Sequence, residues 1–211
     1  MTTRTRVKVC GITREEDAVY AAQCGVDALG LVFYAPSKRA VDAVQAQRIV
    51  AAVPAFVTVT GLFVDAGEAE VERVLQLTRL DLLQFHGDES PEFCRRWGRR
   101  YMKAVRVRAA DDVLRARESY HDAAALLLDT WVDGVPGGTG QVFDWSMIPS
   151  GVSGPLVLAG GLNSANVRRA VQTVRPWAVD VSGGVESAPG IKDPERIKAF
   201  LEEVRKADET D

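Results

Sequence analysis

Hydrophobic residues follow two alternating patterns along this chain. Short runs of mainly aliphatic residues, typical of buried strands, alternate with segments in which apolar residues recur every three or four positions, typical of amphipathic helices. The strand-like runs occupy residues 6–10, 27–33, 56–64, 81–86, 101–107, 124–129, 155–159 and 177–182. Each interval between them has room for a helix and two loops, so the pattern predicts eight strand–helix units.

The segments between the strands carry helix signals of their own. Ile197, Leu201 and Val204 in the last segment are spaced to form one buried stripe on a helix. Asn163-Ser164 and Asp193-Pro194 are predicted helix starts, because a short polar side chain caps free amides and proline loses no bond at the first helical position.

Eight such units can form either a doubly wound sheet or a closed barrel. An even number of units, with no GxGxxG motif after the first strand, favours the barrel. We therefore predict an α/β fold in which residues 1–211 form one domain, a single (β/α)8 TIM barrel. In this fold, binding and catalytic residues lie where the strands end and the following loops begin.

Composition and charge narrow the range of functions. The 211 residues carry a net charge of −3 with no basic stripe, which argues against nucleic acid and anionic membranes as partners. The longest nearly uncharged apolar stretch, residues 49–57, is too short to span a bilayer, and residues 1–6 lack the apolar h-region of a signal peptide, so we do not expect an exported precursor. We expect a cytoplasmic protein.

Cysteine and histidine are sparse, which bears on metals and disulfides. Three cysteines and two histidines show no metal-ligand spacing and no disulfide framework. We expect no metal site. The sequence leaves open whether the protein is a monomer or a homodimer.

Glycines cluster in the last third of the chain, at residues 137–140, 160–161 and 183–184. Glycine allows the backbone to approach a ligand closely and to point several N–H groups at one anion. The last two clusters follow the seventh and eighth predicted strands, where barrels of this class bind phosphate. A phosphorylated small molecule is the predicted ligand; the alternative is that these are ordinary turn glycines.

Cys10 ends the first predicted strand and is a candidate for chemistry. Side chains alternate along a strand, so Lys8 shares a face with Cys10 and is expected to point into the barrel beneath the thiol. A neighbouring ammonium would lower the thiol pKa and favour the reactive thiolate. Asp180 on the last strand is a candidate partner for Lys8. The alternative is that Cys10 is a small buried hydrophobe, the interpretation we give to the other two cysteines.

Asp129 ends an apolar run, residues 124–129. Burial there would raise its pKa and allow it to donate a proton near neutrality, although it could instead cap the following loop. Gln84 and His86 alternate onto one face of the fourth strand. We expect His86 to bind or orient rather than to catalyse.

Ten short segments, in order along nearly the whole chain, together carry a resemblance to a known family. The sequence resembles the phosphoribosylanthranilate isomerases of tryptophan biosynthesis. The matching segments are residues 8–13 (KVCGIT), 37–39 (SKR), 61–65 (GLFVD), 83–89 (LQFHGDE), 128–130 (LDT), 137–140 (GGTG), 143–145 (FDW), 158–162 (LAGGL), 180–186 (DVSGGVE) and 189–193 (PGIKD).

The resemblance implies a cofactor-independent Amadori rearrangement of N-(5-phosphoribosyl)anthranilate to 1-(2-carboxyphenylamino)-1-deoxyribulose 5-phosphate. By position, Asp129 would protonate the ribose ring oxygen and Cys10 would remove the C2 proton. The rate would then show a bell-shaped pH dependence, with thiolate formation on the rising limb. The remaining substrate contacts implied are Arg39 for the anthranilate carboxylate, with Gln84, His86, Gly138, Gly160, Gly161, Asp180, Ser182, Gly183 and Gly184.

One position departs from the family pattern, which usually has a second serine where this chain has Gly183. The change removes a possible hydroxyl contact and keeps the backbone N–H. Sister barrels are the nearest alternatives: an indole-glycerol-phosphate synthase would need a catalytic lysine at a strand end, and a histidine-pathway aminoaldose isomerase an aspartate at the position of Cys10. A different class is a catalytically silent phosphate-binding barrel that acts as a sensor or scaffold.

Overall fold

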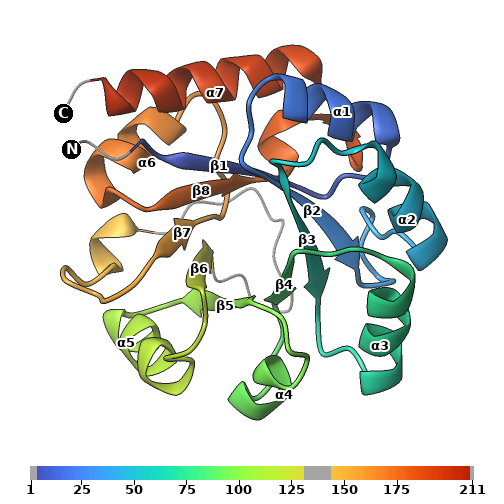
Figure 1. The fold of residues 1–211 in the computed structure, drawn as a ribbon. Coiled ribbons are helices and arrows are strands. Elements are labelled where there is room, and N and C mark those ends of the chain that lie inside the picture. The colour runs from blue at the N-terminus through green and yellow to red at the C-terminus, as the bar shows by residue number, and fades with distance from the viewer. Residues whose placement is uncertain (1–3, 131–143, 210–211) are drawn as a thin grey trace.

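Eight parallel strands close into a barrel in the computed structural model, which describes residues 4–130 and 144–209 (Figure 1). Each strand pairs with its neighbours in the chain, and β1 pairs with β8 to close the ring. The strands are β1 (Arg6–Cys10), β2 (Ala28–Phe33), β3 (Thr58–Phe63), β4 (Leu82–Phe85), β5 (Tyr101–Val107), β6 (Ala125–Thr130), β7 (Leu156–Leu158) and β8 (Ala178–Val181). The prediction of a (β/α)8 barrel with eight strands at these places is confirmed.

Helices surround the barrel on the outside (Figure 1). Within the described residues they are α1 (Glu15–Gln23), α2 (Ala43–Ala52), α3 (Glu68–Leu77), α4 (Pro91–Arg95), α5 (Ala110–Ser119), α6 (Val167–Val174) and α7 (Pro194–Asp208). Their buried residues and the outward-facing residues of the strands form one large apolar core. This core is the hydrophobic layer that holds the helices on the barrel.

One predicted helix start is wrong, and the predicted helix between β6 and β7 falls partly outside the described residues. Residues 144–155, the described part of the connection from β6 to β7, contain only a short 3-10 helix, η1 (Trp145–Met147), and no α-helix. The predicted start at Asn163-Ser164 is wrong by several residues, because α6 begins at Val167. Asn163 instead forms a local turn, since its side chain accepts a hydrogen bond from the backbone N–H of Ala165 (2.9 Å).

The predicted start of α7 is confirmed. Asp193 caps the helix by accepting hydrogen bonds from the backbone N–H groups of Glu195 (2.9 Å) and Arg196 (3.1 Å). Pro194 is the first residue of the helix, where its missing N–H loses no hydrogen bond. Between β8 and α7 the chain forms a 3-10 helix, η2 (Gly183–Val185), and a small antiparallel pair, β9 (Glu186–Ala188) and β10 (Ile191–Lys192).

The inside of the barrel is layered along its axis. The lower layer is apolar and comes mainly from β5 to β8: Met102, Ala104, Ala125, Leu127, Val157, Ala159 and Ala178. Alternation along the same strands then places polar side chains above this layer, towards the strand ends. Packed methyl groups therefore close the bottom of the barrel, and the chemistry gathers at its mouth.

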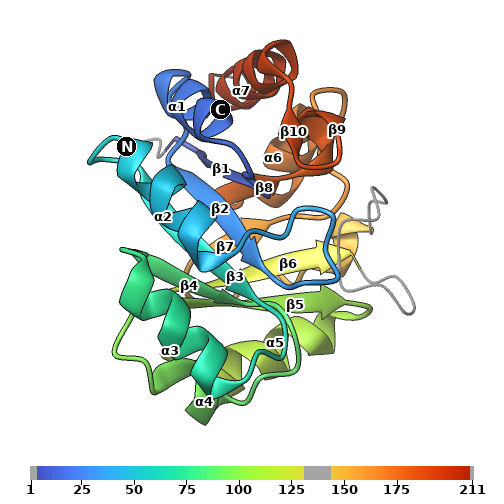
Figure 2. The same cartoon turned by 90° about the vertical axis from the view of Figure 1, so that its right-hand side faces the viewer.

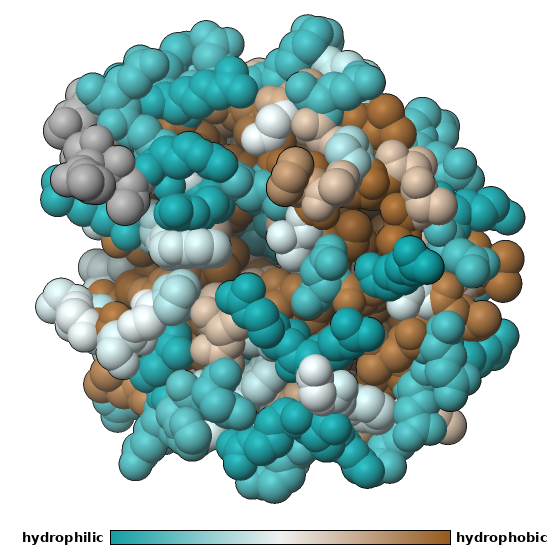
Figure 3. Space-filling model, viewed as in Figure 1, coloured by the Kyte–Doolittle hydropathy of each residue, from teal (hydrophilic) through white to brown (hydrophobic). Residues whose placement is uncertain are grey.

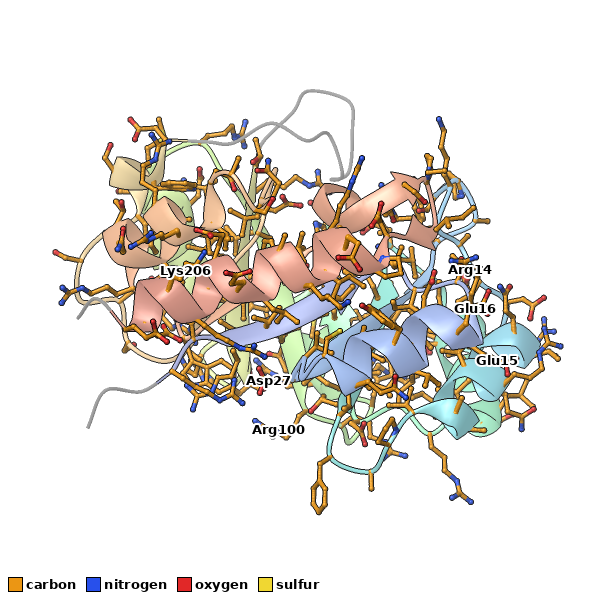
Figure 4. The ribbon with its side chains drawn as sticks, turned by 90° about the horizontal axis from the view of Figure 1, so that it is seen from above. Arg14, Glu15, Glu16, Asp27, Arg100 and Lys206 are labelled. Atoms are coloured by element: carbon orange, nitrogen blue, oxygen red, sulfur yellow. The ribbon has the colours of Figure 1, made fainter. Side chains whose placement is uncertain are left out.

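The two ends of the barrel differ in what they present. Figure 2 shows β5 and β6 pointing towards the side that carries β9 and β10, so this is the mouth formed by the strand ends. In Figure 4, Asp27 and Arg100, which precede β2 and β5, lie away from Arg14, Glu15 and Glu16, which follow β1. Figure 3 shows the opposite, strand-entry face, where hydrophilic side chains surround hydrophobic surface. No helix among the described residues is long and apolar enough to cross a membrane.

Candidate active site

Cys10 lies at the end of β1, buried at the barrel mouth with only 5% of its surface exposed. Lys8 lies below it on the same strand, also inside the barrel. Its ammonium donates a hydrogen bond to Asp180 Oδ1 of β8 (2.9 Å), and both side chains are at least 90% buried. The predicted Lys8–Asp180 pair is therefore confirmed. The Asp180 carboxylate is engaged by Lys8 and lies beneath the mouth of the barrel rather than at its surface.

Lys8 lowers the pKa of the Cys10 thiol, as expected, but the expectation that this pKa is lowered overall is wrong. Burial raises the pKa of Cys10, and this outweighs the lowering by the ammonium groups of Lys8 and Lys192; Asp180 raises it further. Burial lowers the pKa of Lys8, but Asp180 and Cys10 raise it more, so Lys8 is firmly protonated. The unliganded protein therefore holds Cys10 as a neutral thiol near neutral pH.

Asp129 at the end of β6 has a hydrogen-bond partner on each of its carboxylate oxygens. Its Oδ1 accepts a hydrogen bond from the backbone N–H of Thr130 (2.8 Å), and its Oδ2 lies 3.1 Å from His86 Nε2. On the far side of the imidazole, His86 Nδ1 lies 3.0 Å from the amide nitrogen of Gln84. The two polar residues predicted to share a face of β4 thus reach Asp129 as one buried hydrogen-bonded chain.

Arg39, in the loop after β2, reaches across to the segment after β8. Its Nε and Nη2 donate to the two carboxylate oxygens of Glu186 (2.9 and 2.7 Å). This fork-to-fork pair fixes the guanidinium plane and leaves three of its five N–H groups for a ligand. Burial acts to raise the pKa of Glu186. The pKa is nevertheless lowered overall, and the hydrogen bond from Arg39 contributes to this lowering.

Lys192 on β10 connects the ends of two strands behind this pair. Its fully buried ammonium donates to the carbonyl oxygens of Cys10 (2.6 Å) and Ser182 (3.3 Å) and to Glu186 Oε1 (2.8 Å). Burial lowers its pKa despite Glu186. Lys192 therefore links the thiol-bearing end of β1 to the glycine-bearing end of β8.

The glycine loops after β7 and β8 offer unpaired backbone donors. Within the described residues, the N–H groups of Gly160, Gly161, Gly183 and Gly184 donate to no acceptor. Gly160 and Gly161 have φ of +80° and +64°, which a larger residue rarely adopts. A Cβ atom on Gly184 would collide with the carbonyl of Leu162, so the two loops touch at glycine. Gly138 lies outside the described residues.

Gly183 occupies a different kind of position from the other loop glycines. A Cβ atom there would meet Arg39 Nη2 at 3.3 Å and Glu186 Oε2 at 4.0 Å, and the residue is exposed. The serine side chain that the family usually has at this position would therefore point at the Arg39–Glu186 pair. Ser182 lies beside it, half-buried at the end of β8, with its Oγ near Gly11.

Sequence reasoning missed three residues at the mouth. Arg106 on β5 lies opposite Asp129 in the strand register and donates to the His86 carbonyl oxygen (3.2 Å). Its alternation with Met102 and Ala104 was the signal that could have found it. Glu186 and Lys192 lie in two of the segments that carry the family resemblance, but strand alternation does not point to them, because they lie on a short hairpin beyond β8.

A closed (β/α)8 barrel whose mouth carries a buried thiol, a carboxylate, a fixed guanidinium and unpaired backbone N–H groups defines a TIM-barrel enzyme built to handle an anionic small molecule. A sequence profile described as "PRAI: N-(5'phosphoribosyl)anthranilate (PRA) isomerase" matches residues 7–203. The N-(5'-phosphoribosyl)anthranilate isomerase of Pseudomonas fluorescens (strain Pf-5) is 56% identical over 205 residues, covering 97% of this chain and 98% of that protein.

Solved structures agree with this match. A phosphoribosylanthranilate isomerase in complex with reduced 1-(o-carboxyphenylamino)-1-deoxyribulose 5-phosphate is 39% identical, with a TM-score of 0.81 over 96% of this chain and 99% of that one. A structure of monomers generated from the dimeric isomerase of Thermotoga maritima is 38% identical, with a TM-score of 0.82 and the same coverage. The chain belongs to the N-(5'-phosphoribosyl)anthranilate isomerase family.

Proposed function

We propose that this protein converts N-(5'-phosphoribosyl)anthranilate to 1-(2-carboxyphenylamino)-1-deoxyribulose 5-phosphate, an Amadori rearrangement in tryptophan biosynthesis. The observation that carries the proposal is that Cys10 and Asp129 end strands of one closed barrel, beside a fixed guanidinium and two glycine loops with free N–H groups. The reaction needs an acid, a base and sites for two anionic groups, and these residues provide candidates for each.

The two proton transfers divide between the two strand ends. Asp129 donates a proton to the ribose ring oxygen as the ring opens to a Schiff base. Cys10, as the thiolate, removes the C2 proton to give the enolamine, whose tautomerisation gives the ketose product. Lys8 beneath the thiol stabilises the thiolate when it forms, since the ammonium is fixed by Asp180 and fully buried.

Arg39 is assigned the anthranilate carboxylate, through the N–H groups that Glu186 leaves free. An Arg39→Lys variant keeps the positive charge but loses the planar guanidinium group and its bidentate hydrogen-bonding geometry. We expect kcat/KM to fall about 10- to 100-fold, the equivalent of a lost charged hydrogen bond of about 1.5–3 kcal/mol. Steady-state kinetics measures this, with Arg115→Lys as the control on an exposed pair. Wild-type kinetics in Arg39→Lys would remove Arg39 from the binding site.

The substrate phosphate is assigned to the loops after β7 and β8, where the unpaired glycine N–H groups lie. Gly161→Asp places a carboxylate in that space, and we expect the affinity for a phosphate-bearing product analogue to fall by at least about 100-fold, since a like charge replaces hydrogen-bond donors. Aspartate tolerates positive φ better than most residues, so the fold should persist. Calorimetric titration measures the affinity and thermal unfolding measures the fold.

Gly98→Asp is the matched control for this substitution. Gly98 has φ of +62° and open space around its Cβ position, and it lies before β5 at the opposite end of the barrel. Unchanged analogue affinity in Gly161→Asp would place the phosphate elsewhere.

The decisive test is turnover of purified protein, followed by fluorescence, with a chelator present because we propose that no metal or cofactor takes part. A sensor or scaffold barrel would bind the phosphorylated ligand and leave it unchanged. We further propose that residues 1–211 form one domain, that the protein works in the cytoplasm, and that its only ligand is a phosphorylated small molecule. Its assembly as a monomer or a homodimer is measured by light scattering.

A further inference from the structure

Gln84, His86 and Asp129 form a buried hydrogen-bonded chain. The proposed proton transfers do not determine which ring nitrogen of His86 carries the proton in this chain. A neutral imidazole carries its proton on one of two nitrogens, and the neighbours of the ring decide which one. Gln84 is fully buried, and His86 and Asp129 are 7% and 6% exposed, so bulk water is largely excluded as a competing partner. The protein itself therefore sets the position of the proton.

The geometry points to Gln84 as a positioning residue that fixes His86 as the Nε2–H tautomer. In the orientation that the structure gives the Gln84 amide, its nitrogen faces His86 Nδ1 at 3.0 Å and has only hydrogens to offer, so Nδ1 is the acceptor. The ring proton then lies on Nε2, which donates to Asp129 Oδ2 at 3.1 Å. The other Asp129 oxygen already has its donor in the backbone N–H of Thr130.

This tautomer matters for the acid step. With the proton on Nε2, His86 stabilises the carboxylate that Asp129 becomes after it protonates the substrate. With the proton on Nδ1, the lone pair of Nε2 would face Asp129 and would compete with the substrate for the carboxyl proton. Gln84 thus keeps that proton available for the substrate, and it acts through His86, which lies between it and Asp129.

Other charged groups near the ring leave this assignment unchanged. Arg106, from β5, donates to the His86 carbonyl oxygen and not to the ring. The Lys8–Asp180 pair satisfies its own charges on β1 and β8. Within the described residues, the ring nitrogens of His86 have Gln84 and Asp129 as their hydrogen-bond partners. The tautomer therefore depends on these two partners, of which a carboxyl group can accept or donate and the Gln84 amide nitrogen can only donate.

Nitrogen NMR of protein labelled with ¹⁵N-histidine tests the assignment directly. The chain has only two histidines, and His121 is exposed, so it is an internal reference for a ring in water. We expect the unliganded wild type to show His86 with a protonated Nε2 and an unprotonated Nδ1. A protonated Nδ1 in the wild type would overturn the proposal without any variant.

Two variants extend the test. Gln84→Met removes the amide donor at similar size, and Gln84→Glu replaces it with an acceptor that favours a proton on Nδ1. We expect both to lose the wild-type nitrogen pattern of His86. We also expect kcat to fall about 10- to 100-fold with KM within about threefold, because part of the general-acid contribution of roughly 10²- to 10⁴-fold is lost while binding is kept.

Thr60→Val is the matched control, since Thr60 is fully buried inside the same barrel and its hydroxyl has no partner in the described residues. It should leave both the spectrum and kcat unchanged. A Gln84→Met variant that keeps the Nε2–H pattern and wild-type kcat would overturn the proposal. Only the kinetic part of this proposal rests on the proposed function. A fixed Nε2–H tautomer in a protein that has no isomerase activity would contradict the proposed function but would leave the tautomer assignment unchanged.

Discussion

Asp129→Asn is expected to lower kcat about 10²- to 10⁴-fold, the usual contribution of a general acid. Asparagine keeps the size of the side chain, and its oxygen can still accept from His86 or from the backbone N–H of Thr130. It has no acidic proton to give to the ring oxygen, so ring opening loses its acid. Substrate binding uses other groups, and the affinity for a product analogue should stay within about threefold.

Asp81→Asn is the control for this change. Asp81 also accepts a backbone N–H, from Val59 (2.8 Å), but it lies before β4, at the strand-entry end. The same chemical change there should leave kcat within about twofold, because it is remote from the reacting groups. If Asp129→Asn retains kcat within about threefold of the wild type, another group is the acid.

Cys10→Ala should cause a loss of the same order, about 10²- to 10⁴-fold in kcat, because the methyl group cannot remove the C2 proton. Cys10→Ser should not restore activity, since a hydroxyl is a far weaker acid than a thiol and supplies no anion near neutrality. The affinity for a product analogue, measured by titration calorimetry, should remain close to that of the wild type in both variants.

Cys94→Ala is the matched control for the thiol. Cys94 is fully buried in α4, and burial raises its pKa to about 12, so it is a packing residue. We expect Cys94→Ala to lower the free energy of unfolding slightly and to leave kcat unchanged. A Cys10→Ala variant with nearly wild-type kcat would mean that Cys10 is only a small buried hydrophobe.

The raised pKa of Cys10 determines how its protonation depends on pH. In the unliganded protein the amount of Cys10 thiolate, followed by its ultraviolet absorbance with Cys10→Ala as the blank, should rise by about tenfold per pH unit while the pH is below the thiol pKa, which is ordinarily about 8.5. Burial moves that pKa upward, so the rise should continue past the ordinary value rather than level off near neutrality. A thiolate signal that is already complete at pH 7 would show that the pKa is lowered.

The rim of the barrel was predictable because of strand geometry. Parallel strands in a barrel end on the same side, so Cys10 and Asp129 are brought to one rim however the helices pack. Alternation with a period of two likewise placed Gln84 and His86 on one face of β4. The same rule applied to β5 would have placed Arg106 beside Asp129, and the glycine pairs were recognisable from their position after β7 and β8.

The sequence by itself determined the number of units, the strand positions and the residues at the strand ends, because these depend on hydrophobic periodicity, which is local. Only the tertiary structure decided which charges meet. Arg39 and Glu186 are 147 positions apart, and no pattern along the chain pairs them. The state of Cys10 also had to come from the structure, because its pKa is a balance between burial and the distances to Lys8, Lys192 and Asp180. Desolvation and Coulomb energies depend on three-dimensional surroundings, so the sequence correctly placed Lys8 beside the thiol and still gave the wrong direction for the net shift.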